Sequence, residues 1–145
     1  MEKIKVLFVC IHNSARSQMA EAFLQDIGGD GFEVKSAGLE PGTLNPYVVK
    51  VMSELGYDIS NNRTKSVKDF LEKSEHFNYV ITVCDESSAE SCPIFPGNVK
   101  REHWSFPDPS SFKGDEDKIL EETRKVRDKI KNRVALWLVE HKKEY

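Results

Sequence analysis

The sequence has no apolar run long enough to span a bilayer, which takes about 20 residues in a helix. Its first three residues, Met-Glu-Lys, lead directly into an apolar segment without the hydrophobic core of a secretory signal. Only three cysteines occur, an odd number that does not suit a framework of structural disulfides and favours reactive or redox thiols. These absences predict a cytoplasmic protein that is not bound to a membrane.

The net charge is also small, and no segment has a strongly biased composition. The formal charge of −3 comes from 21 basic and 24 acidic residues that are interspersed, so neither nucleic acid nor an anionic membrane is an expected partner. No internal repeat, low-complexity tract or linker stands out, and the 145 residues with 39% hydrophobic content are expected to form one domain, residues 1–145. The histidines and cysteines show no metal-ligand spacing, so we expect no metal and no cofactor.

The most informative stretch is VLFVCIHNSARS, residues 6–17, an apolar run that ends in Cys10 and is followed six residues later by Arg16. It predicts a buried strand that delivers a thiol to a tight loop at the start of a helix. Loop amides and the positive end of the helix dipole would bind a tetrahedral oxyanion and favour the thiolate, which is the attacking species. The planar fork of Arg16 would hold two oxygens of such a group. In the simpler alternative, Cys10 is a small buried hydrophobic residue.

Apolar periodicity predicts strands that alternate with helices. Strands are expected at residues 5–10, 32–37, 77–83 and 99–104. Helices are expected at residues 17–27, at 46–55 after the capping residue Asn45, in a short segment from Ser66 to Leu71, and from Asp115 onward. This order predicts an α/β fold: a single three-layer domain with a central four-stranded parallel sheet and helices on both faces.

Three chemically active residues follow the predicted strands. Cys10 and Cys84 end two of them, and Asp108 follows the fourth in the segment Phe-Pro-Asp-Pro. Ligands of open parallel sheets bind outside the carboxyl ends of the strands. The fold is therefore expected to bring Cys10, Cys84 and Asp108 to one site.

These residues carry a family resemblance. The segment CIHNSARS at 10–17, with the later Asp108-Pro109, resembles the low-molecular-weight protein tyrosine phosphatase fold. Cys84 and Cys92, with a proline after Cys92 and VKREHW at 99–104, resemble the thioredoxin-coupled arsenate reductases built on that fold. The resemblance covers nearly the whole chain, and the cysteine pair separates reductase from phosphatase, since a phosphatase needs neither thiol.

The resemblance implies the reduction of arsenate to arsenite by a relay of three thiols, in arsenic detoxification. Arsenate would bind in a loop formed by Cys10, Ile11, His12, Asn13, Ser14, Ala15 and Arg16, with help from the Ser17 hydroxyl. Cys10 would attack arsenic, Asp108 would protonate the departing oxygen, and Cys84 and then Cys92 would carry the disulfide onward. The implied partners are arsenate, with phosphate or sulfate as competing oxyanions, and thioredoxin, acting on a monomer.

The positions that bind potassium in some of these reductases are only partly matched. Asn13, Glu21 and Ser36 correspond to them, but an acidic residue near Ser66 is absent and Lys65 is nearby. We therefore expect no cation site. Asn13 is interpreted as a brace of the loop, since asparagine tolerates a left-handed backbone and bonds locally.

Ala15 and His12 are two further residues of this loop. Ala15 stands where many relatives carry a further cysteine, so no thiol is expected beside Cys10 in the loop. His12 either assists the Cys10 thiolate or is an exposed loop residue.

Other functions stay open on the sequence alone. A phosphatase of the same fold would hydrolyse phosphotyrosine through a Cys10 phosphocysteine, with Tyr79 or Trp104 as an aromatic wall. A non-enzymatic oxyanion or redox sensor would keep Cys10 but turn nothing over. In either case Cys84 and Cys92 could be idle thiols in a surface loop.

Overall fold

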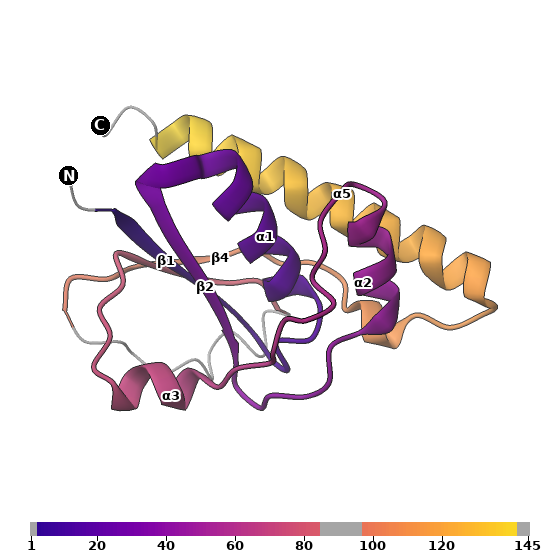
Figure 1. Cartoon of the computed structure of the whole chain (residues 1–145), viewed down its shortest axis with the longest axis horizontal. Helices are drawn as coiled ribbons and strands as arrows, with labels where there is room; N and C mark the ends of the chain where they lie inside the picture. Colours follow the sequence, from indigo (N-terminus) through magenta and orange to yellow (C-terminus); the bar gives the residue numbers. More distant parts are fainter. Residues whose placement is uncertain (1–2, 85–96, 142–145) are drawn as a thin grey trace.

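The computed structural model describes residues 3–84 and 97–141, and a parallel sheet lies at its centre (Figure 1). Its strands are β1 (Ile4–Cys10), β2 (Phe32–Gly38), β3 (Tyr79–Thr82) and β4 (Lys100–His103), in the order β2-β1-β3-β4. Neighbouring strands all run parallel, and Val9 of β1 pairs with Ala37 on one side and Thr82 on the other. The carboxyl ends of the strands therefore lie at one edge of the sheet.

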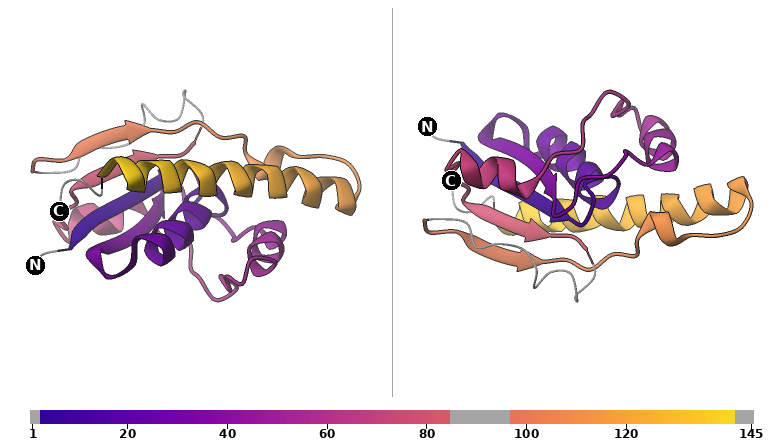
Figure 2. Two further views of the ribbon diagram at one scale, coloured as in Figure 1. Left: turned by 90° about the horizontal axis from the view of Figure 1, so that it is seen from above. Right: turned by 90° about the horizontal axis from the view of Figure 1, so that it is seen from below.

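Helices cover both faces of this sheet, as predicted. One face packs against α1 (Arg16–Gly28) and α5 (Glu116–His141), and the other against α3 (Val67–Glu72) (Figure 1, Figure 2). The first half of α5 extends past the carboxyl edge, where it packs on α2 (Pro46–Ser53). Alternate residues of β1 enter the two cores. Val6 and Phe8 pack into the core under α1 and α5, and Leu7 and Val9 pack into the core under α3. This two-sided burial explains why β1 is apolar at nearly every position.

Local capping fixes the starts of two helices near the carboxyl edge. The side chain of Asn45 accepts hydrogen bonds from the Tyr47 and Val48 amides, and Pro46 occupies the first turn of α2. Ser66 accepts from the Lys68 amide at the start of α3. Both starts agree with the sequence prediction.

The predicted elements are present, and their ends differ from the predicted ones by one or two residues. α2 stops at Ser53 instead of residue 55, because the Leu55 and Gly56 amides bond to carbonyls three residues earlier and close a tight turn. β3 and β4 are each four residues long. Two short 3₁₀ turns, Gly29–Gly31 and Pro109–Ser111, were not predicted, because a single turn carries no apolar period.

α5 is the longest helix, with 26 residues, and its outward positions are mostly charged. Over the residues that the structure describes, no helix combines the length and the apolar character that crossing a membrane requires.

Candidate active site

Cys10 and Cys84 come to the same edge of the sheet on neighbouring strands. Cys10 is the last residue of β1, and Cys84 lies two residues after the end of β3. The Val83 amide donates to the Val9 carbonyl at 2.8 Å, which continues the pairing of the two strands up to the residue before Cys84. Both thiols are buried, at 3% and 1% exposure, in one hydrophobic cluster. Cys92 lies outside the described residues.

The carbonyl groups of the loop at residues 10–15 are all engaged by donors outside its hollow. Four of them accept backbone amides of the β2–α2 connection at 2.8–3.1 Å, pairing Cys10 with Leu39, Ile11 with Glu40, His12 with Gly42 and Ser14 with Asn45. The other two accept from α1, Asn13 from the Gln18 side chain and Ala15 from the Met19 amide. With its carbonyls held outside, the loop turns its amides inward, which is the geometry of an anion-binding nest.

The start of α1 follows this loop directly and would favour an anion in the same place. Ala15 is the N-cap residue and provides no side-chain cap, so no side chain competes for the first amides of the helix. Gly38 of β2 packs directly against the loop backbone. A Cβ atom on Gly38 would lie 2.8 Å from the Asn13 nitrogen and 2.8 Å from the His12 carbonyl carbon. Only glycine allows this approach.

Two buried residues, Asn13 and Ser17, form a hydrogen-bond chain to the Cys10 sulfur. The Asn13 amide donates to Cys10 Sγ at 3.1 Å, and Asn13 Nδ2 donates to Ser17 Oγ at 2.7 Å. Ser17 Oγ lies 2.9 Å from Cys10 Sγ. A Cys10 thiolate has no hydrogen to donate, so facing a thiolate the Ser17 hydroxyl is the donor in this contact. Two donors therefore converge on Cys10, and both stabilise a thiolate. Asn13 has the left-handed backbone expected of a loop brace, with φ 54°.

Arg16 connects this loop with the segment that follows β4. The guanidinium is 3% exposed and donates from NH1 to the Phe106 carbonyl at 3.0 Å. Its NH2 group lies 3.8 Å from Asp108 Oδ2. Asp108 Oδ1 accepts the Ser110 amide at 2.9 Å, and its backbone is extended before Pro109, as the sequence predicts. Asp108 thus joins Cys10 and Arg16 at the carboxyl edge.

Residues 5–145 match the model of the low molecular weight phosphotyrosine protein phosphatase family. The chain belongs to this family. It is 42% identical to an arsenate reductase of Bacillus subtilis over 135 residues, which cover 92% of this chain and 94% of that protein. Such relatives show that the chain is an enzyme.

Solved structures agree with this membership. An arsenate reductase in its oxidized state is 31% identical, with a TM-score of 0.78 over 94% of this chain and 97% of that one. A thioredoxin-dependent arsenate reductase of Corynebacterium glutamicum is 29% identical, with a TM-score of 0.63 over 94% of this chain and 63% of that one. The predicted low-molecular-weight phosphatase fold is confirmed.

The aromatic wall suggested for a phosphatase activity is wrong for both of its residues. Tyr79 is 4% exposed and begins β3, so it lies at the opposite end of that strand from Cys84. Trp104 is 5% exposed and packs against Phe8 in the core. Neither side chain is accessible to a substrate in the oxyanion loop.

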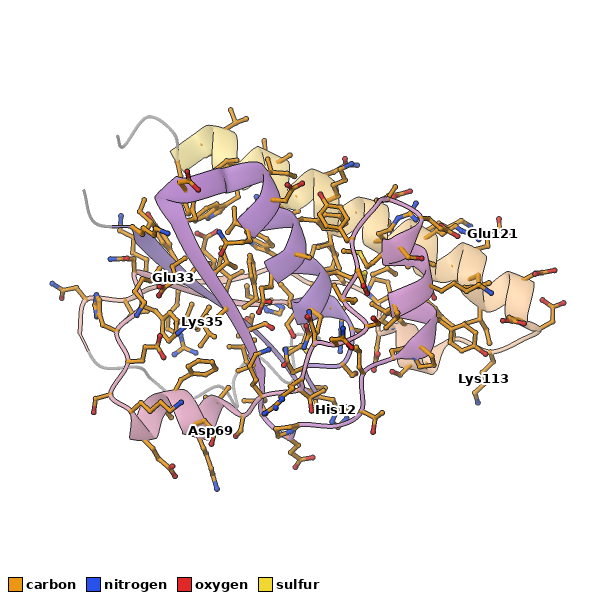
Figure 3. All side chains as sticks on the ribbon, in the orientation of Figure 1. His12, Glu33, Lys35, Asp69, Lys113 and Glu121 are labelled. Carbon is orange, nitrogen blue, oxygen red and sulfur yellow. The ribbon has the colours of Figure 1, made fainter. Side chains whose placement is uncertain are left out.

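His12 is an exposed residue on the outside of the loop from Cys10 to Arg16 (Figure 3). Its Nδ1 lies 2.8 Å from the Glu40 carbonyl, which can only accept, so Nδ1 carries the hydrogen. The described contacts of the Cys10 sulfur are with Ser17 and Asn13 instead. Of the two interpretations of His12, the structure supports the exposed loop residue.

Two of the three residues that correspond to a cation site, Glu21 and Asn13, have nitrogen-bearing partners instead. Lys65 Nζ lies 4.0 Å from Glu21 Oε1, so an ammonium already neutralises that carboxylate. Asn13 Oδ1 accepts N–H groups from Lys65 and from Gln18. The Ser36 hydroxyl is buried without a hydrogen-bond partner among the described residues. In residues 3–84 and 97–141, no three His, Cys, Asp or Glu side chains come together as metal ligands.

Sequence reasoning missed Gln18, which is fully buried and bonds to the oxyanion loop. It falls outside the apolar stripe of α1, so periodicity predicts a solvent-facing side chain there. The Phe106 carbonyl, which accepts from Arg16, was also missed, because a backbone acceptor has no sequence signature.

Proposed function

We propose that this enzyme reduces arsenate to arsenite through Cys10, Cys84 and Cys92, and that thioredoxin regenerates it. The observation that carries the proposal is the delivery of two buried cysteines to one sheet edge by neighbouring strands. A phosphatase of this fold needs the nucleophile alone. The likeness to arsenate reductases, one of them thioredoxin-dependent, supports the same choice.

Arsenate binds in the loop from Cys10 to Arg16 in this proposal. Inward amides and the start of α1 hold the oxyanion charge, and the Arg16 fork takes two of its oxygens. Phosphate and sulfate share the tetrahedral shape and charge of arsenate, so they compete for the same loop.

The first chemical step forms a covalent bond between sulfur and arsenic. The Cys10 thiolate, stabilised by Ser17 Oγ and the Asn13 amide, attacks arsenic. One hydroxyl group of arsenate leaves and takes a proton from Asp108, so that it departs as water. Arsenic is still pentavalent in this adduct.

The second step transfers two electrons. The Cys84 thiolate attacks the Cys10 sulfur, a Cys10–Cys84 disulfide forms, and the sulfur–arsenic bond breaks with its electron pair left on arsenic. Arsenic becomes trivalent and leaves as arsenite. Cys92 then attacks Cys84 and releases Cys10 as a thiolate, and the dithiol of thioredoxin reduces the Cys84–Cys92 disulfide.

One coupled assay tests this function. Purified protein is given arsenate, NADPH, thioredoxin and thioredoxin reductase, and arsenate-dependent oxidation of NADPH is compared with hydrolysis of an aryl phosphate by the same preparation. We expect NADPH oxidation that Cys10→Ser abolishes, because a serine hydroxyl in this site stays protonated and has no base to activate it. Rapid aryl phosphate hydrolysis that Cys84→Ser leaves unchanged, without NADPH oxidation, would instead identify a phosphatase.

A further inference from the structure

We propose that Gln18 is a positioning residue for Cys10: with the segment at residues 62–65, it holds the Asn13–Ser17 hydrogen-bond chain in the orientation that stabilises the Cys10 thiolate. Gln18 touches neither the sulfur nor the oxyanion loop amides in the contacts above, and it acts through Asn13. The inference rests on the proposed function and extends it, because it concerns how the hydrogen bonds to the proposed nucleophile are oriented.

The Gln18 amide has a single favourable orientation. Its side chain is fully buried. Its Oε1 accepts from Asn62 Nδ2 at 3.0 Å, and its Nε2 lies 3.0–3.1 Å from three oxygen atoms: Asn13 O, Asn13 Oδ1 and Arg63 O. A flipped amide would place Oε1 against those three acceptors and would leave Asn62 without its acceptor. The bonds to Asn62 and Arg63 therefore fix which way Gln18 donates.

Gln18 in turn fixes the orientation of the Asn13 amide. Asn13 Oδ1 accepts from Gln18 Nε2 at 3.1 Å and from the Lys65 backbone amide at 2.9 Å. With Oδ1 held by two donors, Nδ2 must face Ser17 Oγ, which it contacts at 2.7 Å. The Ser17 hydrogen then has Cys10 Sγ as its acceptor. Each donor in this chain is set by the one before it, so hydrogen bonds that begin at residues 62–65 end on the sulfur.

Gln18 also holds the Asn13 backbone in the conformation that this hydrogen-bond chain requires. Its bond to the Asn13 carbonyl spans the left-handed residue of the loop, φ 54°, and keeps that carbonyl outside the anion hollow. Without Gln18, the carbonyls of Asn13 and Arg63 would each lose a buried donor. Lys65 would still hold Asn13 Oδ1, so the expected loss is partial.

Other charged and titratable groups near Cys10 could also affect its ionisation. Arg16 and Asp108 pair at the same edge, Cys84 follows the adjacent strand, and His12 points outward. The hydrogen bonds of the Gln18 side chain go instead to Asn13, Asn62 and Arg63. A change at Gln18 that alters the ionisation of Cys10 therefore acts through Asn13 and Ser17.

The test measures alkylation of Cys10 by iodoacetamide from pH 5 to 9, because the thiolate is the reacting form. A background with Cys84→Ser and Cys92→Ser leaves Cys10 as the sole thiol. We expect Gln18→Leu to shift the alkylation profile to higher pH and to slow alkylation at pH 7 by about three- to tenfold. Asn62 lines a cavity of about 640 Å³, and its side chain donates to Gln18 Oε1. Asn62→Ala removes this bond. It should shift the alkylation profile in the same direction and slow alkylation at pH 7 by about two- to threefold.

Two control variants separate positioning from stability. Gln25 lies on the same helix and also bonds to backbone through both ends of its amide, donating to the Phe32 carbonyl and accepting from the Val34 amide. Gln25→Leu should lower the unfolding temperature comparably but leave the alkylation profile in place. Asn61→Ala, at the exposed neighbour of Asn62, should change neither property.

The inference is overturned if folded Gln18→Leu and Asn62→Ala alkylate with the profile of their controls. If Gln18→Leu does not fold, the profile of Asn62→Ala decides alone. Alkylation needs neither arsenate nor thioredoxin, so a protein that fails the coupled assay still tests the role of Gln18.

Discussion

Arg16 NH2 lies 3.8 Å from Asp108 Oδ2, and Arg16 NH1 donates to the Phe106 carbonyl in the same segment. One buried arginine thus joins the oxyanion loop after β1 to the loop after β4. The contact brings the carboxyl group that we propose as the general acid to the loop that follows β1, and leaves it 31% exposed. The proposed roles in anion binding and in proton delivery therefore fall on different residues and can be tested separately.

Asp108→Asn should reduce turnover and leave anion binding nearly unchanged. Asparagine keeps the oxygen that accepts the Ser110 amide, so the loop stays in place. A general acid acts in the transition state, and its loss should lower kcat by about 10²- to 10⁴-fold. Phosphate affinity from isothermal titration and kcat from the coupled assay check this. Asp115→Asn is a matched control, because Asp115 also accepts a backbone amide, at the exposed start of α5. An unchanged kcat in Asp108→Asn would make Asp108 only a loop residue.

Arg16→Lys should weaken phosphate binding by at least about tenfold, because an ammonium lacks the planar fork that can hold two phosphate oxygens side by side while also donating to the Phe106 carbonyl. Arg127→Lys is the matched control. Arg127 is also a buried arginine whose NH1 donates to a carbonyl, that of Val51, and pairs with a carboxylate, that of Glu54. It should lose stability but bind phosphate normally. Equal affinities in the two variants would contradict the role of Arg16.

Much of the fold and part of the site could be predicted from the sequence. The apolar run before Cys10 indicated β1, since a strand covered on both faces has no polar side. Asn45-Pro46 and Asp108-Pro109 fix backbone conformation locally, so the start of α2 and the extended Asp108 were predictable. The convergence of Cys10, Cys84 and Asp108 followed from the topology of parallel sheets alone.

The residues that hold the site in place were not predictable, because their roles depend on tertiary contacts. Gln18 has the polarity of an exposed helix position, and its buried role arises from segment 62–65, which folds over it. Gly38 has no positive φ and so gives no turn signal; its need for glycine comes from the loop packed against it. The roles assigned to Cys92 and thioredoxin stay predictions.

Gly38→Ala should impair the oxyanion loop through steric conflict alone. The added Cβ would lie within 2.9 Å of three backbone atoms of residues 11–13, which cannot move as a side chain can. We expect a loss of about 1–3 kcal/mol in unfolding free energy and weaker phosphate binding. Gly56→Ala is the control, since φ is 88° there and no atom lies within 4 Å. It should cost about 1 kcal/mol without any effect on phosphate affinity. Normal affinity in Gly38→Ala would show that the loop tolerates displacement.

Glu75 should make stability depend on pH in the acid range. Burial raises the pKa of Glu75, but hydrogen bonds from Lys35 and Lys5 outweigh burial and hold it below its usual 4.5 (Lys35 is labelled in Figure 3). A lowered folded-state pKa stabilises the fold at pH values above 4.5, and this contribution disappears as the pH falls through the lowered value. Glu75→Gln should therefore cost about 1–3 kcal/mol at pH 7 and progressively less below pH 4.5 in urea unfolding.

The control for Glu75 is a carboxylate in an exposed ion pair. Glu116 pairs with Lys50, and both side chains are more than half exposed. Glu116→Gln should change the unfolding free energy little at any pH. A difference between Glu75→Gln and the unsubstituted protein that stays constant from pH 7 to pH 3 would contradict the linkage.

Cys84 and Cys92 divide the proposed relay into two steps that single substitutions separate. Cys92→Ser should still produce one equivalent of arsenite, because Cys10 and Cys84 suffice to supply two electrons, and should then remain as a Cys10–Cys84 disulfide. Cys84 is buried at 1% exposure, so thioredoxin should reduce that disulfide poorly. Cys84→Ser should stop earlier, with the arsenic adduct formed and no stoichiometric arsenite.

Quenching each variant after one equivalent of arsenate and mapping its disulfides by peptide mass spectrometry distinguishes these states. The expected order follows from thiol–disulfide exchange, which needs a free attacking sulfur at each step and an accessible disulfide at the last. Repeated turnover of Cys92→Ser with thioredoxin at the unsubstituted rate would remove Cys92 from the relay. A full equivalent of arsenite from Cys84→Ser would mean that another thiol resolves the adduct, and the adjacency of β1 and β3 would then no longer explain the chemistry.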